Sequence, residues 1–241
     1  MKKAVLFAAG LGTRLKPFTD HHPKALAEVN GKSLLERNIL YLYQSGIREI
    51  IINVHHFADQ IKAVIAAYQM PELSLLISDE VNGPFETGGG LVFAKDLIVG
   101  DAEPFVVMNV DILTNMELQG MMDYHQQIRP LATLAVTKRN SSRQFLFDDH
   151  MRLVGWRNNN TGENRWSAGE REGTVAYGFS GIHVISPEIF QLMPQGGKFS
   201  ITDTYIELAA TQTILGYDHS GDHVIDVGKP EALEKASLLF R

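Results

Sequence analysis

The residues best suited to chemistry lie near the start of the chain, in residues 8–26, AAGLGTRLKPFTDHHPKAL. An apolar run leads directly into Gly10 and Gly12. A strand followed by a glycine-rich turn binds anions, because backbone N–H groups can point at phosphate oxygens with no side chain in the way. Arg14 and Lys24 can add a planar fork of donors and a compact positive charge. The pattern predicts a phosphate-binding loop.

Two other glycine-loop motifs do not fit this chain. The dinucleotide-binding fingerprint needs a third glycine where the chain has Leu15, and Pro17 and Pro23 prevent a helix from beginning there. The tripeptide Gly-Lys-Ser at 31–33 is similar to the end of a Walker loop, but the glycine required five residues earlier is Leu26. We therefore interpret this tripeptide as a turn and a helix cap.

Two aspartates far apart in the sequence could hold a metal ion. Asp111 follows the apolar residues 105–108, and Asp226 ends a short apolar stretch before a turn and a helix. Ligands bind at the carboxyl ends of parallel strands, and Mg²⁺ takes carboxylate oxygens while it keeps much of its water. Taken alone, Asp111 could equally cap the next helix.

Residues 8–26 resemble the signature of the sugar-1-phosphate nucleotidyltransferases, in which this loop wraps a nucleoside triphosphate. One departure is Ala25, where that family usually has a second proline. The resemblance implies that Arg14 and Lys24 are the catalytic residues that act on the phosphates. It also implies nucleotide-binding residues in the loop, namely Ala8, Ala9, Gly10, Gly12 and Thr13. Lys16 could contact pyrophosphate or face solvent.

Residues 223–233, HVIDVGKPEAL, resemble a C-terminal element of the same family. The resemblance implies that Asp111 and Asp226 together chelate one magnesium ion beside the α-phosphate, so Mg²⁺ is the implied cofactor. Val110 and Val224 stand where the family commonly has glycine and tryptophan. Neither departure removes a ligand atom.

Residues 83–90, GPFETGGG, resemble the segment with which that family recognises the base. Glycines suit this role because a flat base can approach the main chain closely. The further nucleotide contacts that the resemblance implies are Glu80, Glu86, Thr87, Gly88 and Asn109. The Glu-Thr-Gly-Gly-Gly form is similar to the short N-acetylmuramate-1-phosphate uridylyltransferase-like branch.

In that branch, residues 179–185, FSGIHVI, fall where the sugar pocket is built. The sugar-binding residues implied here are Gly181, Asp203 and Lys198, although Asp203 could instead line a helix. Larger relatives carry a Glu-Lys-Pro tripeptide whose lysine contacts the sugar phosphate, and this chain has none. Lys198 or Arg143 could supply that charge.

The segments around these motifs alternate between apolar runs and helical patterns. Strands are expected at 4–8, 50–54, 73–77, 105–108 and 175–185, and helices at 58–68 and 88–97. Ser33 and Glu36 form a capping box that begins another helix, and Gly46 suits its C-terminal end. Strands separated by helices imply right-handed βαβ units and a parallel sheet.

After residue 137 the pattern changes. A hairpin is expected from 145–147 and 153–156, a mobile polar loop at 157–173, and a helix that Ser186 caps, with Pro187 in its first turn. The expected fold class is α/β, with a Rossmann-like, mixed, mostly parallel central sheet flanked by helices. The resemblance makes this the nucleotide-diphospho-sugar transferase fold. One domain, 1–241, is expected, with a nucleotide-binding half at 1–137 and a sugar-binding half at 138–241.

The composition limits the partners. The 241 residues include 22 basic and 28 acidic side chains, a net charge of −6, which argues against binding to nucleic acid or to an anionic membrane. With no cysteine there is no disulfide or thiolate metal site, and adjacent His55 and His56 point apart, so zinc is not expected. The apolar run near the start is too short for a signal peptide. We expect a cytoplasmic monomer or small homo-oligomer.

The predicted function is the transfer of a nucleoside monophosphate from a nucleoside triphosphate, UTP first, to a sugar 1-phosphate, which releases pyrophosphate. The two substrates are thus the expected partners. Alternatives within the same class are a mannose-1-phosphate guanylyltransferase and a phosphocholine cytidylyltransferase. A different class, a non-catalytic nucleotide-sugar sensor, would be expected to lose a catalytic cation or a metal aspartate, and all four of these residues are present.

Overall fold

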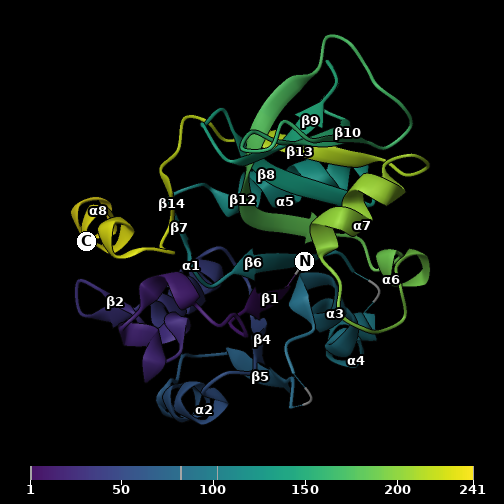
Figure 1. Cartoon of the computed structure of the whole chain (residues 1–241). Coiled ribbons are helices and arrows are strands. Elements are labelled where there is room, and N and C mark those ends of the chain that lie inside the picture. The colour runs from purple at the N-terminus through teal and green to yellow at the C-terminus, as the bar shows by residue number, and fades with distance from the viewer. Residues whose placement is uncertain (1, 82, 102, 241) are drawn as a thin grey trace.

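The computed structural model describes residues 2–81, 83–101 and 103–240. Within them one sheet contains ten strands, and Figure 1 shows it running through the molecule from β5 to β9 and β10. The strands of this sheet are β1 (Lys3–Phe7), β4 (Glu49–Val54), β5 (Ser74–Asp79), β6 (Phe105–Asn109), β8 (Ala132–Thr137), β9 (Arg143–Phe147), β10 (Leu153–Asn158), β11 (Asn164–Trp166), β12 (Val175–Ile185) and β13 (Ile214–Asp218). Two short two-stranded sheets are formed by β2 (Glu28–Val29) with β3 (Lys32–Ser33) and by β7 (Ile112–Thr114) with β14 (Val224–Asp226).

Most strands of the large sheet run parallel. β1 pairs in parallel with β4 and β6, β4 pairs in parallel with β5, and β13 pairs in parallel with β8. β12 lies antiparallel to both β6 and β8, so β6 and β8 share one direction. The carboxyl ends of β1, β4, β5, β6, β8 and β13 therefore lie at the same edge of the sheet. The expected α/β class with a mixed, mostly parallel sheet is confirmed.

Helices cover both faces of the sheet (Figure 1). They are α1 (Leu34–Gln44), α2 (Ala58–Ala67), α3 (Glu86–Phe93), α4 (Lys95–Ile98), α5 (Leu118–Ile128), α6 (Ile189–Leu192), α7 (Ile201–Leu208) and α8 (Pro230–Leu239). One core contains side chains of α1, α2 and α5, and the other contains side chains of α3, α4, α6 and α7. No helix that the structure describes has both the length and the apolar composition needed to cross a bilayer.

Alternation along β1 explains why its sequence is continuously apolar. Ala4 and Leu6 belong to one core, whereas Val5 and Phe7 belong to the other. A strand buried on both faces has no polar side, so the alternating pattern of a half-exposed strand is absent. The same arrangement places the glycine loop, which follows Phe7, at the edge where the parallel strands end.

The helix predicted from the capping box is also confirmed. The Ser33 hydroxyl accepts a hydrogen bond from the Glu36 N–H at 3.2 Å, and the Glu36 carboxylate accepts one from the Ser33 N–H at 2.9 Å. Gly46 follows the helix with a φ of 88°, a left-handed conformation that favours glycine. Because both ends of α1 are defined by local chemistry, the sequence sufficed to predict them.

Three predicted segments differ from the structure. The expected helix at 88–97 is two helices, α3 and α4, which Ala94 separates. The expected mobile loop at 157–173 is partly ordered, since Asn164–Trp166 forms β11 and pairs antiparallel with β10. The helix expected to begin at Ser186 spans only Ile189–Leu192, because the Ser186 hydroxyl donates to the Pro130 carbonyl at 2.8 Å and does not cap it.

Candidate active site

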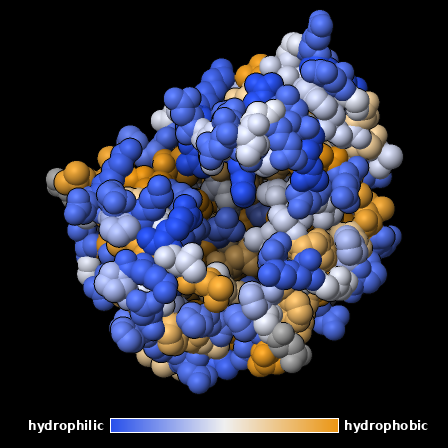
Figure 2. All heavy atoms as spheres, viewed as in Figure 1, coloured by the Kyte–Doolittle hydropathy of each residue, from blue (hydrophilic) through white to orange (hydrophobic). Residues whose placement is uncertain are grey.

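A cavity of about 470 Å³ lies at the carboxyl edge of the sheet. Figure 2 shows it as a hollow in the middle of the molecule's face, with hydrophilic atoms around its rim. Its wall is formed by residues that follow or end β1, β4, β5 and β6, together with residues of two later segments: Phe7, Ala8, Ala9, Gly10, Leu11, Gly12, Thr13, Arg14, Lys24, Asn53, Glu80, Pro84, Glu86, Thr87, Asn109, Val110, Asp111, Lys198 and Gly228. Ligands of open α/β sheets bind at this edge.

The glycine loop is shaped by close contacts with the segment that carries Lys24. Gly12 has a φ of +61°, and a Cβ atom there would lie 2.8 Å from the Lys24 Cβ and 2.9 Å from the Thr19 Cγ2. The Thr19 hydroxyl also donates to the Gly12 carbonyl at 3.0 Å. Only glycine suits this position, since a side chain would push the lysine away from the loop.

Each candidate catalytic cation pairs with a candidate metal aspartate. Lys24 Nζ contacts Asp111 Oδ2, and Arg14 Nη2 lies 3.8 Å from Asp226 Oδ2. The first pair is largely buried, with side chains 10% and 21% exposed, whereas the second is 57% and 44% exposed. The Lys24–Asp111 contact is therefore weakly screened by water, while Arg14 can turn toward a ligand.

The backbone brings the two aspartates together across the β7–β14 ladder. Asp226 lies opposite Ile112, and the Val227 N–H donates to the Asp111 carbonyl at 2.7 Å. The next residue, Gly228, leaves room for both side chains of the neighbouring pair, because a Cβ there would lie 2.6 Å from Arg14 Nη2 and 2.7 Å from Asp226 Oδ1. Segments 115 residues apart in sequence thus form one charged site.

The donor atoms of this pair suit magnesium. Two carboxylates offer hard oxygen ligands, and the remaining positions of an octahedral Mg²⁺ would be filled by phosphate oxygens and water. Among the described residues, no group of three or more histidine, cysteine, aspartate or glutamate side chains is placed to hold a metal. A site completed by the substrate is therefore the kind that Asp111 and Asp226 could form.

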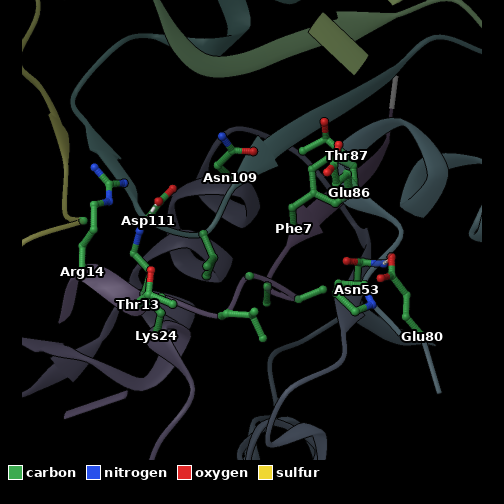
Figure 3. A pocket seen from close by; sticks show the side chains of 18 of the residues that line it. Phe7, Thr13, Arg14, Lys24, Asn53, Glu80, Glu86, Thr87, Asn109 and Asp111 are labelled. Atoms are coloured by element: carbon green, nitrogen blue, oxygen red, sulfur yellow. Dashed lines mark hydrogen bonds and ion pairs between the residues drawn. The ribbon is translucent and has the colours of Figure 1, made fainter. Parts of the chain in front are cut away.

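The other end of the cavity is built around a buried carboxylate. Glu80 is 1% exposed, and it accepts hydrogen bonds from Asn53 Nδ2 at 2.7 Å and from the Phe85 N–H at 2.9 Å. Gly90 makes room for it, because a Cβ there would lie 2.5 Å from Glu80 Oε1. Figure 3 places Glu80 and Asn53 at one end of the cavity, and Arg14 and Asp111 at the other.

Most of the sequence-predicted nucleotide residues line this cavity. Those that do are Ala8, Ala9, Gly10, Gly12, Thr13, Glu80, Glu86, Thr87 and Asn109, together with Arg14, Lys24, Asp111 and Lys198. Lys198 lies 3.8 Å from the Glu86 carboxylate, and Figure 3 shows Glu86 on the side of the cavity away from Arg14. The Thr87 hydroxyl accepts the Ile201 N–H at 3.1 Å, which ties the start of α3 to α7.

Other predicted residues lie outside the cavity wall. The Gly88 N–H donates to the Phe199 carbonyl at 2.9 Å, so this amide binds the chain and not the cavity. Gly181 packs against Asn109, and Asp203 pairs with Arg165 at 2.6 Å. Asp226 is beside the cavity through its contact with Arg14.

Three remaining candidates also lie apart from the cavity wall. Lys16 pairs with Asp20 at 2.9 Å on the surface, and Arg143 is exposed at the start of β9. His55 Nδ1 lies 2.8 Å from the Glu80 carbonyl, which fixes the end of β4 against the residue after β5.

The sequence analysis missed six residues of the wall: Phe7, Leu11, Asn53, Pro84, Val110 and Gly228. Asn53 had a usable signal, because it is a polar residue inside the apolar run that forms β4. A buried polar side chain near the carboxyl end of a parallel strand points to the ligand edge. The other residues are apolar or small and give no such signal.

Comparisons with known proteins indicate the family to which the chain belongs. The nucleotidyl transferase family matches residues 3–145, more than half of the chain. The N-acetylmuramate alpha-1-phosphate uridylyltransferase of Caulobacter vibrioides is 32% identical over 96% of this chain and 93% of its own length. The mannose-1-phosphate guanylyltransferase catalytic subunit beta of Danio rerio is 33% identical over 56% of this chain and 38% of its own length.

Solved structures share the fold. HddC from Yersinia pseudotuberculosis, complexed with GMP-PN, has a TM-score of 0.79 at 24% identity, with both chains fully covered. A UDP-glucose pyrophosphorylase from Acinetobacter has a TM-score of 0.78 at 19% identity, covering 100% of this chain and 93% of that one. With the family match and the full-length relative, these findings lead to one conclusion: the chain belongs to the nucleotidyl transferase family.

Proposed function

We propose that the protein is a magnesium-dependent sugar-1-phosphate nucleotidyltransferase that uses UTP. The observation that carries the proposal is the pairing of Lys24 with Asp111 and of Arg14 with Asp226 at the mouth of the glycine loop. Four charged side chains from three distant segments meet where a triphosphate would lie. The Caulobacter relative, similar over nearly the whole chain, supports UTP and an N-acetylated sugar 1-phosphate as the first pair to test.

The reaction is an in-line displacement at the α-phosphorus. An oxygen of the sugar 1-phosphate forms a bond to this phosphorus, the bond to the β-phosphate oxygen breaks, and pyrophosphate leaves with its electron pair. Both reactants are anions, so the site must offset like charges before they can meet. Backbone N–H groups of the glycine loop and the guanidinium of Arg14 suit this role toward the triphosphate.

Lys24 places a positive charge beside Asp111 at the reacting centre. Its side chain is largely buried and packs where Gly12 leaves room for it, so the charge needs little reorganisation as the reaction proceeds. Asp111 and Asp226 would hold magnesium, which supplies Lewis-acid charge to the phosphates when bound. None of these side chains needs to become covalently attached to the substrate.

The test is pyrophosphate release with Mg²⁺, in which UTP, GTP, CTP and ATP are screened against N-acetylmuramate, N-acetylglucosamine, glucose and mannose 1-phosphates. The expected result is release with UTP and one acceptor, which is lost when EDTA replaces the metal. The match to the Danio relative makes GTP with mannose 1-phosphate the second candidate. A folded protein that releases no pyrophosphate with any pair would contradict the proposal.

A further inference from the structure

A buried polar cluster lies beside the active site and has no role in the reaction as described so far. It consists of Thr137, Arg139, Ser180 and His219, which we call the arginine cluster. Thr137, Ser180 and His219 are each at most 4% exposed. Three atoms of this cluster, Thr137 Oγ1, Arg139 Nε and His219 Nδ1, are buried without a hydrogen-bond partner, and only one other such side-chain atom occurs among the described residues.

Strand topology places the cluster at the ligand edge of the sheet. Arg139 follows the carboxyl end of β8 by two residues, as Asp111 follows the carboxyl end of β6. β6 and β8 point the same way, because both lie antiparallel to β12. Gly181 of β12 already packs against Asn109, so the part of β12 that precedes it extends past the end of β6.

The guanidinium of Arg139 lies in a space that a glycine leaves open. A Cβ at Gly178 would lie 2.8 Å from Arg139 Cγ and 2.9 Å from its Nε. Gly178 is opposite Thr137 in the β8–β12 ladder, so the guanidinium and the Thr137 hydroxyl share one face of the sheet. Arg139 Nη2 donates to the Phe179 carbonyl at 2.7 Å, which holds the group in place.

Arg139 lies near the Asp226 carboxylate without pairing with it. Burial lowers its pKa, and the neighbouring Asp226 carboxylate raises it. Across the described residues Arg139 makes no ion pair, whereas Arg14 approaches Asp226 from the glycine loop. A half-buried guanidinium with an unpartnered N–H and no carboxylate partner is a site for an anion.

We propose that Arg139 binds the phosphate of the sugar 1-phosphate. The inference rests on the proposed function and names the residue that receives the acceptor. Arg139 stands apart from the cavity wall that the glycine loop forms, which leaves it available to the second substrate. The unpartnered atoms of Thr137 and Arg139 can both donate, which suits an anion and not a cation.

The two cations considered from the sequence are less suitable than Arg139 for binding the phosphate of the sugar 1-phosphate. Lys198 lies beside Glu86, which Figure 3 shows on the side of the cavity away from Asp111. Arg143 is exposed, so water would screen its charge. Arg139 alone of the three combines partial burial with a place near Asp226.

The experiment measures initial rates of pyrophosphate release in the Arg139→Ala variant, with Arg152→Ala as the control. Arg152 is exposed, and among the described residues its hydrogen bonds are made by its backbone N–H and carbonyl, both with Asp148. We expect the KM for the sugar 1-phosphate to rise by about 30-fold or more in Arg139→Ala, because an anion loses its buried partner. The KM for the nucleoside triphosphate should stay within about twofold of the wild-type value, as expected for a substitution away from the groups that bind this substrate. An unchanged acceptor KM overturns the inference.

A second variant, Arg139→Gln, guards against a folding defect in Arg139→Ala. It removes the charge but keeps a long polar side chain in the space that Gly178 leaves open. The same rise in acceptor KM is expected, with an unfolding midpoint close to that of the wild type. A merely structural role of Arg139 would lower stability and leave the acceptor KM unchanged, which would also overturn the inference.

Calorimetric titration of each sugar 1-phosphate separates this inference from the proposed function. If the wild type releases no pyrophosphate but binds a sugar 1-phosphate, and Arg139→Ala loses that binding, the proposed function falls and the inference stands. If the wild type turns over and Arg139→Ala binds the acceptor equally well, only the inference falls. A wild type that neither turns over nor binds any sugar 1-phosphate overturns both.

Discussion

The loops that follow β1 and β6 hold charged side chains in ion pairs, whereas buried histidines lie on β12 and beside β8. Lys24 pairs with Asp111 at the first place. At the second, His125 lies 2.9 Å from the Thr133 hydroxyl, and His183 Nδ1 lies 2.5 Å from the Tyr205 hydroxyl. Burial lowers the pKa of His125 to about 4 and that of His183 to about 3. Both rings are therefore uncharged near neutral pH.

The difference separates side chains suited to catalysis from side chains that stabilise the fold. Charged pairs at the edge of the sheet can exchange their partner for a phosphate or a metal, so their cost is recovered when the ligand binds. Neutral histidines inside the sheet satisfy hydrogen bonds without bringing a charge into the core. Changes at the ion pairs should thus alter catalysis, and changes around β8 and β12 should alter stability. Arg139 is the exception on which the further inference depends.

The largest expected effect is on turnover in Lys24→Ala. Removing a charge aimed at the transferring phosphoryl group should lower kcat by about 10³-fold, with every acceptor affected alike. Initial rates of pyrophosphate release measure this, with Lys235→Ala as the control because Lys235 is an exposed residue of α8. Thermal unfolding verifies that the variant folds. Unchanged turnover would remove Lys24 from the mechanism.

Asp111→Asn should have the next largest effect. The amide keeps the size of the side chain but removes the charge that would bind magnesium, so kcat should fall by about 10²-fold. The Mg²⁺ concentration for half-maximal rate should rise as well, which a defect in acceptor binding would not cause. Asp123→Asn, on the exposed side of α5, is the matched control. An unchanged magnesium requirement would contradict the assignment of Asp111 as a ligand.

Acidification tests the buried histidines. In the unfolded chain the histidine pKa is near 6.5, so these rings bind protons below that pH. In the folded protein, His183 and His125 bind a proton only near pH 3 and pH 4. Stability should therefore fall as the pH falls, and each ring should cost about 2 kcal/mol of unfolding free energy between pH 7 and pH 5. Urea unfolding at the two pH values measures the loss.

The control for this prediction is His150→Gln, since the His150 side chain is 78% exposed. His183→Gln removes one buried titrating group, so its loss on acidification should be smaller than that of the wild type by about 2 kcal/mol. Equal losses in the wild type and in His183→Gln would show that this ring is not the source.

The part of the site proposed for the nucleotide could be predicted from the sequence because phosphate chemistry restricts residue types. Gly12 must leave space for Lys24, and the loop that contains both is continuous in sequence. The pairing of Asp111 with Asp226 was reached only through resemblance, since β7 and β14 are three residues long and carry no distinctive pattern. Short ladders between distant segments are set by tertiary packing.

The part of the site proposed for the sugar 1-phosphate could not be predicted in the same way. Neither β8 nor β13 is among the predicted strands, although every residue of β8 is buried. Arg139 stands in a polar stretch that reads as a solvent-exposed loop, and the glycine that makes room for its side chain comes from β12. A contact of this kind depends on the register of two strands, which the local sequence does not encode.

The smallest expected effect tests the contrast between catalysis and stability within residues 1–137, the proposed nucleotide-binding half. Ser33 caps α1 by accepting the Glu36 N–H, and Ser33→Ala should cost about 1 kcal/mol of unfolding free energy. Urea unfolding measures this, with Ser237→Ala in α8 as a serine control that removes no N-cap. Because α1 packs behind the glycine loop and lines no part of the cavity, kcat should be unchanged. If Ser33→Ala instead lowered kcat as Lys24→Ala does, the start of α1 would have to position the loop. Catalysis and fold stability would then be coupled in residues 1–137, and the contrast with β8 and β12 would fail.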